Sequence, residues 1–140
     1  MFYFPSSFRK LAVIYVREGE SVPPVMTADT QETSCRDYCK THRIPVSHSV
    51  RVSCGVEESL DVLKMLLRTL PKEVDTIIAM RFFCYSVQLQ DLNRLCLAFR
   101  CRQTQLYSLE LMGPIHSSFR YLLEYDDENA ERYYSEMLHE

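Results

Sequence analysis

The run Leu11–Arg17, LAVIYVR, constrains the fold of this chain more than any other stretch. It holds an unbroken apolar segment, Ala12 to Val16, and ends in a polar turn, Glu18-Gly19-Glu20-Ser21. Near-continuous apolar runs of this length are typical of central parallel strands that are covered on both faces. In open α/β sheets ligands bind beyond the carboxyl ends of such strands. The turn after Arg17 is therefore the first place to look for chemistry.

The remaining apolar patterns alternate between strand and helix. Further strands are expected at 45–52, 74–81 and 104–111, and helices at about 30–41, 58–70 and 88–100. Residues 117–125 fit either helix or strand, and a last helix is expected from Asp126 or Asp127 to Leu138. This order predicts a three-layer α/β fold with a mostly parallel central sheet of 4–5 strands, flavodoxin-like in layout.

The sequence also makes specific predictions about individual helices and strands. Asp29 or Thr30 is expected to cap the first helix, and Glu58 or Ser59 to begin the second. The second helix has a leucine stripe. It comprises Leu60, Leu63, Leu66, Leu67 and Leu70. The stretch 45–52 alternates weakly, which predicts a half-solvated edge strand with its valines and His48 on one side.

Charge is distributed unevenly along the 140 residues, which we expect to form a single domain with its core at about 10–111. Residues 1–120 carry a net charge of +3, whereas residues 121–140 carry −6. The segment at about 117–139 is therefore expected to be an acidic, helical appendage. Acidic segments repel phosphate, which disfavours DNA binding through this part of the chain.

The sequence offers no sign of a membrane or secreted protein. No apolar run reaches the 18 or so residues that a membrane span needs, and the N-terminus has no long apolar segment of the signal-peptide type. The six cysteines form no tight framework, so we expect reduced thiols and a cytoplasmic location. Glycine-rich phosphate loops and common catalytic motifs are also missing, and we expect no cofactor.

Four stretches in this order resemble the catalytic domain of serine site-specific recombinases, the resolvase and invertase family. They are Tyr15-Val16-Arg17-Glu18-Gly19, Gln31 at the start of the first helix, Cys54-Gly55 before the second, and VDTIIAMRFFCYSV followed by QLQDLNRL. QLYSLEL fits the strand after that helix. The resemblance covers about residues 10–111 and implies a resolvase-like fold, with oligomerisation and DNA as partners.

The chain departs from that family where the chemistry is done. The family's reaction needs a serine that attacks a DNA phosphodiester and several arginines that neutralise the phosphoryl oxygens. The nucleophile position holds Gly19, and the Asp-Arg-Leu-x-Arg positions fall on 83–87, where neither arginine remains. The arginine expected before the second helix aligns near Glu57 or Glu58. Only Arg17 remains of the cationic set, so the resemblance implies a degenerate, catalytically inactive copy.

Other constellations leave alternatives open. Ser21, two residues past the motif position, is an outside candidate for a nucleophile if a bulge presents it. Cys35, Cys39 and His42 fit either three metal ligands on one helix or two buried thiols near a helix end, and we favour the latter. Cys54 is either a reactive thiol or a small loop residue, and we favour the loop residue.

Two aromatic clusters are also open to two interpretations. The segment Phe82-Phe83-Cys84-Tyr85 is either a plug that fills the former active-site crevice, which we favour, or an exposed patch for a partner. Tyr133-Tyr134 with Met137-Leu138 forms either an oligomer face or a packing face. Arg17 is either a retained anion site or an arginine paired with Glu18 or Glu20.

The sequence therefore predicts a non-enzymatic resolvase-like domain. It would act as a self-associating or partner-binding module that accompanies or regulates a mobile-element recombinase. Two alternatives remain. One is an active serine recombinase that uses Ser21, and the other is a flavodoxin-like domain that binds a small molecule or nucleotide in the crevice past Arg17.

Overall fold

A computed structural model describes residues 11–19, 22, 26–81, 84–85, 89–115, 132 and 135–136. Within these residues the chain forms a five-stranded sheet in the order β2-β1-β3-β4-β5. The strands are β1 (Ala12–Glu18), β2 (Val46–Ser53), β3 (Thr76–Ala79), β4 (Gln105–Ser108) and β5 (Gly113–Pro114). β1 to β4 pair in parallel and β5 pairs antiparallel to β4. The predicted α/β class and mostly parallel sheet are confirmed.

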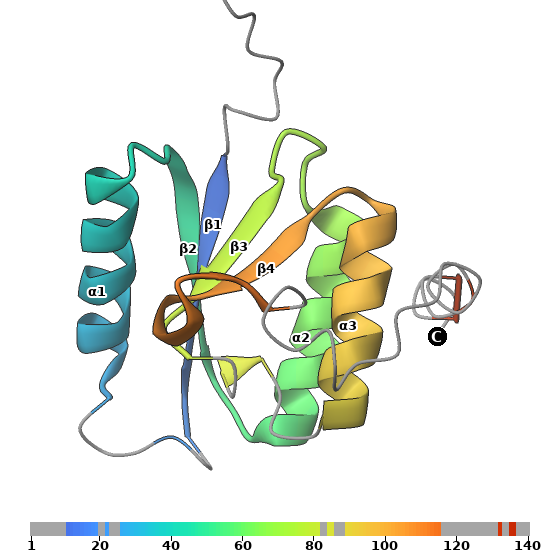
Figure 1. The fold of residues 1–140 in the computed structure, drawn as a ribbon. Coiled ribbons are helices and arrows are strands. Elements are labelled where there is room, and N and C mark those ends of the chain that lie inside the picture. Colours follow the sequence, from blue (N-terminus) through green and yellow to red (C-terminus); the bar gives the residue numbers. More distant parts are fainter. Residues whose placement is uncertain are drawn as a thin grey trace, which may run out of the picture.

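The helices cover the two faces of the sheet unequally. Figure 1 shows α1 (Ala28–Thr41) alone on one face, with α2 (Val56–Thr69) and α3 (Leu89–Cys101) together on the other. Side chains of β1 belong to both hydrophobic cores. Val13 and Tyr15 lie in the larger core under α2 and α3, while Ile14 lies in the smaller core under α1. This position between two helical layers explains why the sequence of β1 is apolar without interruption.

The start of α1 differs from the expectation. The cap is Thr27, whose side-chain oxygen accepts a hydrogen bond from the Thr30 amide at 3.2 Å, so Asp29 and Thr30 lie inside the helix. The carboxylate of Glu18 also accepts a hydrogen bond from the Ala28 amide at 3.2 Å. The helix start is thus bonded to the end of β1, which no local pattern indicated.

β2 is the expected edge strand, but its alternation is interrupted. The register to β1 shifts between Ala12 and Val13, which are paired with Val46 and His48. Because a bulge reverses the side to which the following residues point, Val46 packs under α1 while Val50 and Val52 pack on the other core. The prediction that all the valines share one side was wrong.

α2 begins at Val56, directly after the cap residue Gly55, and therefore two or three residues earlier than expected. Its leucine stripe is confirmed. Leu63, Leu66, Leu67 and Leu70 are buried, and Leu60 is half-buried against the same core. α3 begins and ends within one residue of the expected bounds.

The expected strand at 104–111 was wrong in its second half. β4 ends at Ser108, a short 3₁₀ turn, η3 (Leu109–Leu111), follows, and the chain then turns back at Met112 to form β5. Pro114 lies in this edge strand, where its missing N–H costs no ladder hydrogen bond. β5 has only two residues, which is too short for an alternating apolar pattern to be recognised in the sequence.

Two further points concern the rest of the chain. The elements expected between 117 and 138, with Tyr133 and Tyr134, lie outside the residues that the structure describes, apart from 132, 135 and 136. Among the described helices none is both long and apolar enough to cross a membrane.

Candidate functional site

Arg17 lies near the carboxyl end of β1 and is completely buried, with 0% of its surface exposed. Its Nε donates to the carbonyl of Cys84 at 3.2 Å, and its Nη1 donates to the carbonyl of Cys54 at 3.3 Å. These carbonyls belong to the segment after β3 and to the end of β2. The guanidinium therefore connects three parts of the chain that lie far apart in the sequence.

Gln31 fixes the backbone on the other side of Arg17. Its side-chain amide donates to the carbonyls of Arg17 at 2.8 Å and of Met26 at 2.9 Å. Its Oε1 accepts from the Arg17 amide at 3.2 Å and from the Cys84 thiol at 3.6 Å. Gln31 is fully buried, so all of these bonds are shielded from water. The side chain ties the first turn of α1 to the end of β1.

Gly19 occupies the position that the resemblance assigns to the nucleophile. Its φ is +126°, a conformation that side-chain-bearing residues rarely adopt. A Cβ placed on Gly19 would lie 2.5 Å from the carbonyl oxygen of Cys54. The neighbouring Cys54 amide donates to the Glu18 carbonyl at 3.0 Å, which holds the two chain segments together. There is no room for a serine side chain at this position without a backbone shift.

A buried hydroxyl network lies beneath this end of the sheet. Ser59 Oγ is 2.6 Å from the Tyr15 hydroxyl and 3.2 Å from the Cys84 carbonyl. The Tyr85 hydroxyl is within 2.9 Å of the Ile77 carbonyl and 2.8 Å of the Tyr107 carbonyl. The rings of Tyr15 and Tyr85 stack with centroids 5.7 Å apart. No sequence pattern indicates this network, because its members are brought together only by the fold.

The ionisation of these groups follows from their burial. Desolvation raises the pKa of both Tyr15 and Tyr85 above the ordinary tyrosine value, although the Ser59 hydrogen bond partly opposes the shift for Tyr15. Both phenols therefore stay neutral at physiological pH. In this state they donate hydrogen bonds to carbonyls or hydroxyls and supply no anion for base or nucleophilic chemistry.

Two solved structures share this arrangement of strands and helices. The N-terminal catalytic domain of TP901-1 integrase is 18% identical with a TM-score of 0.59, over 73% of this chain and 78% of that one. The C-terminal catalytic domain of ISC1926 TnpA, an IS607-like serine recombinase, is 15% identical with a TM-score of 0.54, over 71% and 69%. The chain has the fold of a serine recombinase catalytic domain. The resemblance found in the sequence is thus confirmed for the fold.

Comparison of the sequence alone gives no further relatives. No protein-family model matches the chain, and no curated protein matches it significantly. At 18% and 15% identity the two structural neighbours show a common fold and leave the activity of this recombinase-like chain open.

The cysteines of the recombinase-like fold are shielded from solvent to different degrees. Burial raises the pKa of Cys54, against a smaller lowering effect of Arg17, and it also raises the pKa of Cys84. Because the thiolate is the reactive form, these shifts favour the interpretation of Cys54 as a loop residue. Cys35 and Cys39 lie on the buried face of α1, and burial raises the pKa of Cys35 to about 12.

His42 lies apart from those two thiols. Its ring packs on Tyr38, with centroids 4.2 Å apart, at the exposed end of α1. Among the described residues no three His, Cys, Asp or Glu side chains are grouped in a way that could hold a metal ion. Three further candidates from the sequence analysis lie outside the described residues. They are Ser21, Phe82 and Phe83.

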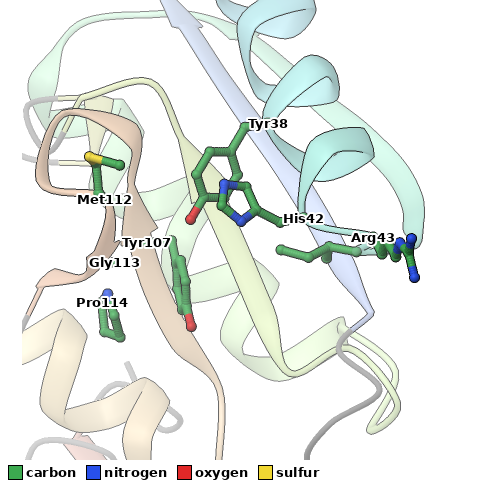
Figure 2. A pocket seen from close by; sticks show the side chains of 8 residues that line it. Tyr38, His42, Arg43, Tyr107, Met112, Gly113 and Pro114 are labelled. Carbon is green, nitrogen blue, oxygen red and sulfur yellow. The ribbon is translucent and has the colours of Figure 1, made fainter.

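A separate pocket of about 410 Å³ lies on the α1 face of the sheet (Figure 2). It is lined by the C-terminal end of α1, the loop that follows it, β4 and the segment around β5. The lining residues are Tyr38, His42, Arg43, Ile44, Tyr107, Met112, Gly113 and Pro114. None of them contacts Arg17 in the hydrogen bonds described above. Sequence reasoning missed this pocket, because its two walls are separated by more than sixty residues of chain.

Proposed function

We propose that this chain is a non-catalytic member of the serine recombinase fold that acts as a self-association or partner-binding module. The observation that carries the proposal is the lack of space for a side chain at Gly19. The recombinase reaction needs a serine hydroxyl there, and a Cβ at this point would overlap the Cys54 carbonyl oxygen at 2.5 Å. The site therefore lacks the nucleophile and the space to accommodate one.

The state of Arg17 supports the same conclusion. An arginine that stabilises a phosphoryl group must present its guanidinium to the ligand. Arg17 is fully buried, and its guanidinium donates to carbonyls of Cys54 and Cys84. In this orientation it stabilises the ends of two neighbouring segments. The same burial argues against a small molecule or nucleotide in the crevice past Arg17.

The segment after β3 supports the plug interpretation for its two described residues. Cys84 and Tyr85 are both 0% exposed. By the resemblance, Cys84 aligns with an arginine of the family motif and Tyr85 with its leucine, and here the two residues contribute a thiol, an aromatic ring and backbone carbonyls to the interior. Replacement of charged groups by buried apolar ones is compatible with a scaffold and unfavourable for DNA phosphate binding.

The proposed biological role is association, either with a second copy of this chain or with a partner protein. Both structural neighbours are catalytic domains of recombination proteins, and a domain with that fold but without the chemistry can still offer a binding surface. We propose that it accompanies or regulates a mobile-element recombinase in the cytoplasm. The six free cysteines are compatible with a reducing compartment.

The test combines a chemical and a physical measurement on the full chain. The protein is incubated with a random-sequence duplex DNA library, and covalent protein–DNA adducts are sought on denaturing gels and by intact-mass spectrometry. We expect no adduct from the wild type or from Gly19→Ser. An adduct that disappears in Ser21→Ala would overturn the proposal and establish a working recombinase.

Sedimentation velocity over a hundredfold range of protein concentration tests the association. A mass that rises with concentration supports a homo-oligomer. A constant monomer mass would exclude self-association and leave a different protein as the partner, to be sought by adding purified recombinases of the same fold. A monomer that binds none of them would contradict the binding-module role.

A further inference from the structure

We propose that the pocket between α1 and β4–β5 binds a small planar aromatic molecule that carries an anionic group. This inference is independent of the proposed function, because the pocket and the Arg17 region share no residue. Its volume of about 410 Å³ lies in the range of pockets that hold small organic ligands. The ligand class follows from the chemistry of the walls.

Aromatic rings line the pocket from two sides. Tyr38 in the last turn of α1 and the cap residue His42 present rings that are tilted by 34° to each other, and Tyr107 presents a ring from β4. Figure 2 shows these rings around the hollow, with Met112 and Pro114 beyond Tyr107. Aromatic side chains and methionine sulfur favour planar aromatic partners through stacking and edge contacts.

The charge of the lining has one sign. Arg43 and His42 are the basic residues of the lining, whereas none of the eight lining residues is acidic. The Arg43 side chain is exposed in the loop after α1, and in Figure 2 it extends away from the three rings into solvent, from where rotation about its side-chain bonds can bring it to a bound anion. Hydrogen bonds from arginine to a carboxylate or phosphate are stronger than those between neutral groups. The rim therefore selects an anion, while the interior selects an aromatic body.

Two residues of the pocket lining have a left-handed backbone conformation. Arg43 and Met112 both have φ of +55°, a left-handed conformation that glycine adopts more easily. Both residues line the pocket, and Met112 is 76% exposed. Both residues follow the end of a helical turn, α1 at Arg43 and η3 at Met112, where a left-handed residue is common.

A third residue provides a matched control for that conformation. Gln103, with φ of +62°, follows α3 just as Arg43 follows α1. In both places the next amide bonds back to the helix, from Ile44 to the Cys39 carbonyl at 2.8 Å and from Thr104 to the Phe99 carbonyl at 2.9 Å. Gln103 does not line the pocket. The two helix ends thus differ in ligand access but share their backbone geometry.

The test is an NMR titration of the ¹⁵N-labelled chain with two anions, adenosine monophosphate and 2-naphthoate. Adenosine and 2-naphthalenemethanol are their neutral counterparts. We expect saturable shifts of the His42, Arg43 and Gly113 amides with at least one anion, and about tenfold weaker binding of its neutral counterpart, as loss of one charge-assisted hydrogen bond implies. Binding of only one anion identifies the source as nucleotide or aromatic carboxylate.

Variants separate binding from folding. Arg43→Gly places a glycine in the left-handed conformation and removes the guanidinium, so affinity should fall about tenfold while the melting temperature stays the same or rises. Gln103→Gly should change the melting temperature in the same direction and leave affinity unchanged. Lys40→Gln, which removes a charge from the same helix end outside the pocket, should also leave affinity unchanged.

Three results would overturn the proposal. The first is the absence of saturable shifts at the pocket amides with both anions. The second is equal affinity for charged and neutral members of each pair, or equal affinity in wild type and Arg43→Gly. The third is a set of shifts confined to Glu18, Gly19 and Cys54, which would move the binding site to the carboxyl end of β1.

Discussion

At each end of the sheet an arginine side chain donates hydrogen bonds to backbone carbonyls. Arg17 does so at the carboxyl end and Arg102 at the amino end. Arg102 donates from Nη1 to the carbonyls of Leu67 at 3.3 Å and Leu70 at 3.1 Å, and from Nη2 to the Pro71 carbonyl at 2.8 Å. It thereby satisfies the last carbonyls of α2, which have no partner within the helix. Arg17 does the same for the ends of β2 and of the segment after β3.

The two arginines differ in burial and in what was expected of them. Arg102 is half-buried and lies at the end of the sheet where no chemistry takes place in this class of fold. Arg17 is fully buried at the end where ligands normally bind. We infer that Arg17 has the same structural role at the carboxyl end as Arg102 has at the amino end, since both donate to backbone carbonyls. The following changes test that inference.

The largest effect is expected for Arg17→Met. The change leaves the Cys54 and Cys84 carbonyls without this donor in a dry interior, and we expect a loss of about 3–5 kcal/mol in the free energy of unfolding. Urea denaturation monitored by circular dichroism measures it. A wild-type protein that phosphate stabilises, combined with an Arg17→Met variant that phosphate no longer affects, would instead make Arg17 an anion site.

A smaller loss of about 2–4 kcal/mol is expected for Gly19→Ala. The new Cβ meets the Cys54 carbonyl oxygen at 2.5 Å, and the residue must also keep a φ of +126°. Gly113→Ala is the matched control, since a Cβ there has no heavy atom within 4 Å, and it should change stability by less than about 0.5 kcal/mol. If both variants are equally stable, the nucleophile position can accept a side chain and the non-catalytic proposal loses its main support.

Arg102→Met should cost less than Arg17→Met, about 1–3 kcal/mol, because water can reach the carbonyls around this half-buried side chain. The same urea experiment measures it. A cost greater than that of Arg17→Met would reverse the order of the two ends and contradict the inference that the carboxyl end is the more tightly closed.

The smallest effect concerns how the stability of the protein depends on pH through Glu32, whose carboxylate pairs with two arginines on the surface. Hydrogen bonds from Arg36 and Arg51, each 2.8 Å from the Glu32 carboxylate, lower the pKa of Glu32 from 4.5 to about 2. A lowered pKa in the folded state means that the contribution is complete above about pH 4.5 and is lost as the pH falls toward 2. Because the arginines are about half exposed, solvent screening limits the contribution to below about 1 kcal/mol.

Comparing the urea midpoints of wild type and Glu32→Gln at neutral and acidic pH checks this effect. The two proteins should differ at neutral pH and converge as the pH falls. A difference that grows toward low pH would have the wrong sign and would contradict the assigned pKa.

Much of the fold could be predicted because it depends on local periodicity. The apolar run 12–16 and the leucine stripe of α2 bury the side chains that their spacing predicts. The family resemblance also rested on a linear pattern, which the shared fold of the two solved structures confirms. Element ends were less accurate, since Thr27 and Gly55 cap helices that the sequence began two or three residues later.

The candidate site could be predicted only in part. The absence of a serine at Gly19 is a property of the sequence, and so is the presence of Arg17. The sequence left open where the guanidinium points, because its acceptors at Cys54 and Cys84 are 37 and 67 residues away. The hydroxyl network around Ser59 escaped notice for the same reason.

The order of strands and helices and the absence of a serine at position 19 can both be read from the sequence, since residue type and short-range spacing encode them. Tertiary structure alone decided that Arg17 is buried against carbonyls, that Gly19 is closed by Cys54, and that β5 turns back on β4 to form a pocket with α1. These features arise where distant segments meet, and hydrogen bonding and steric overlap between such segments have no counterpart in the linear pattern.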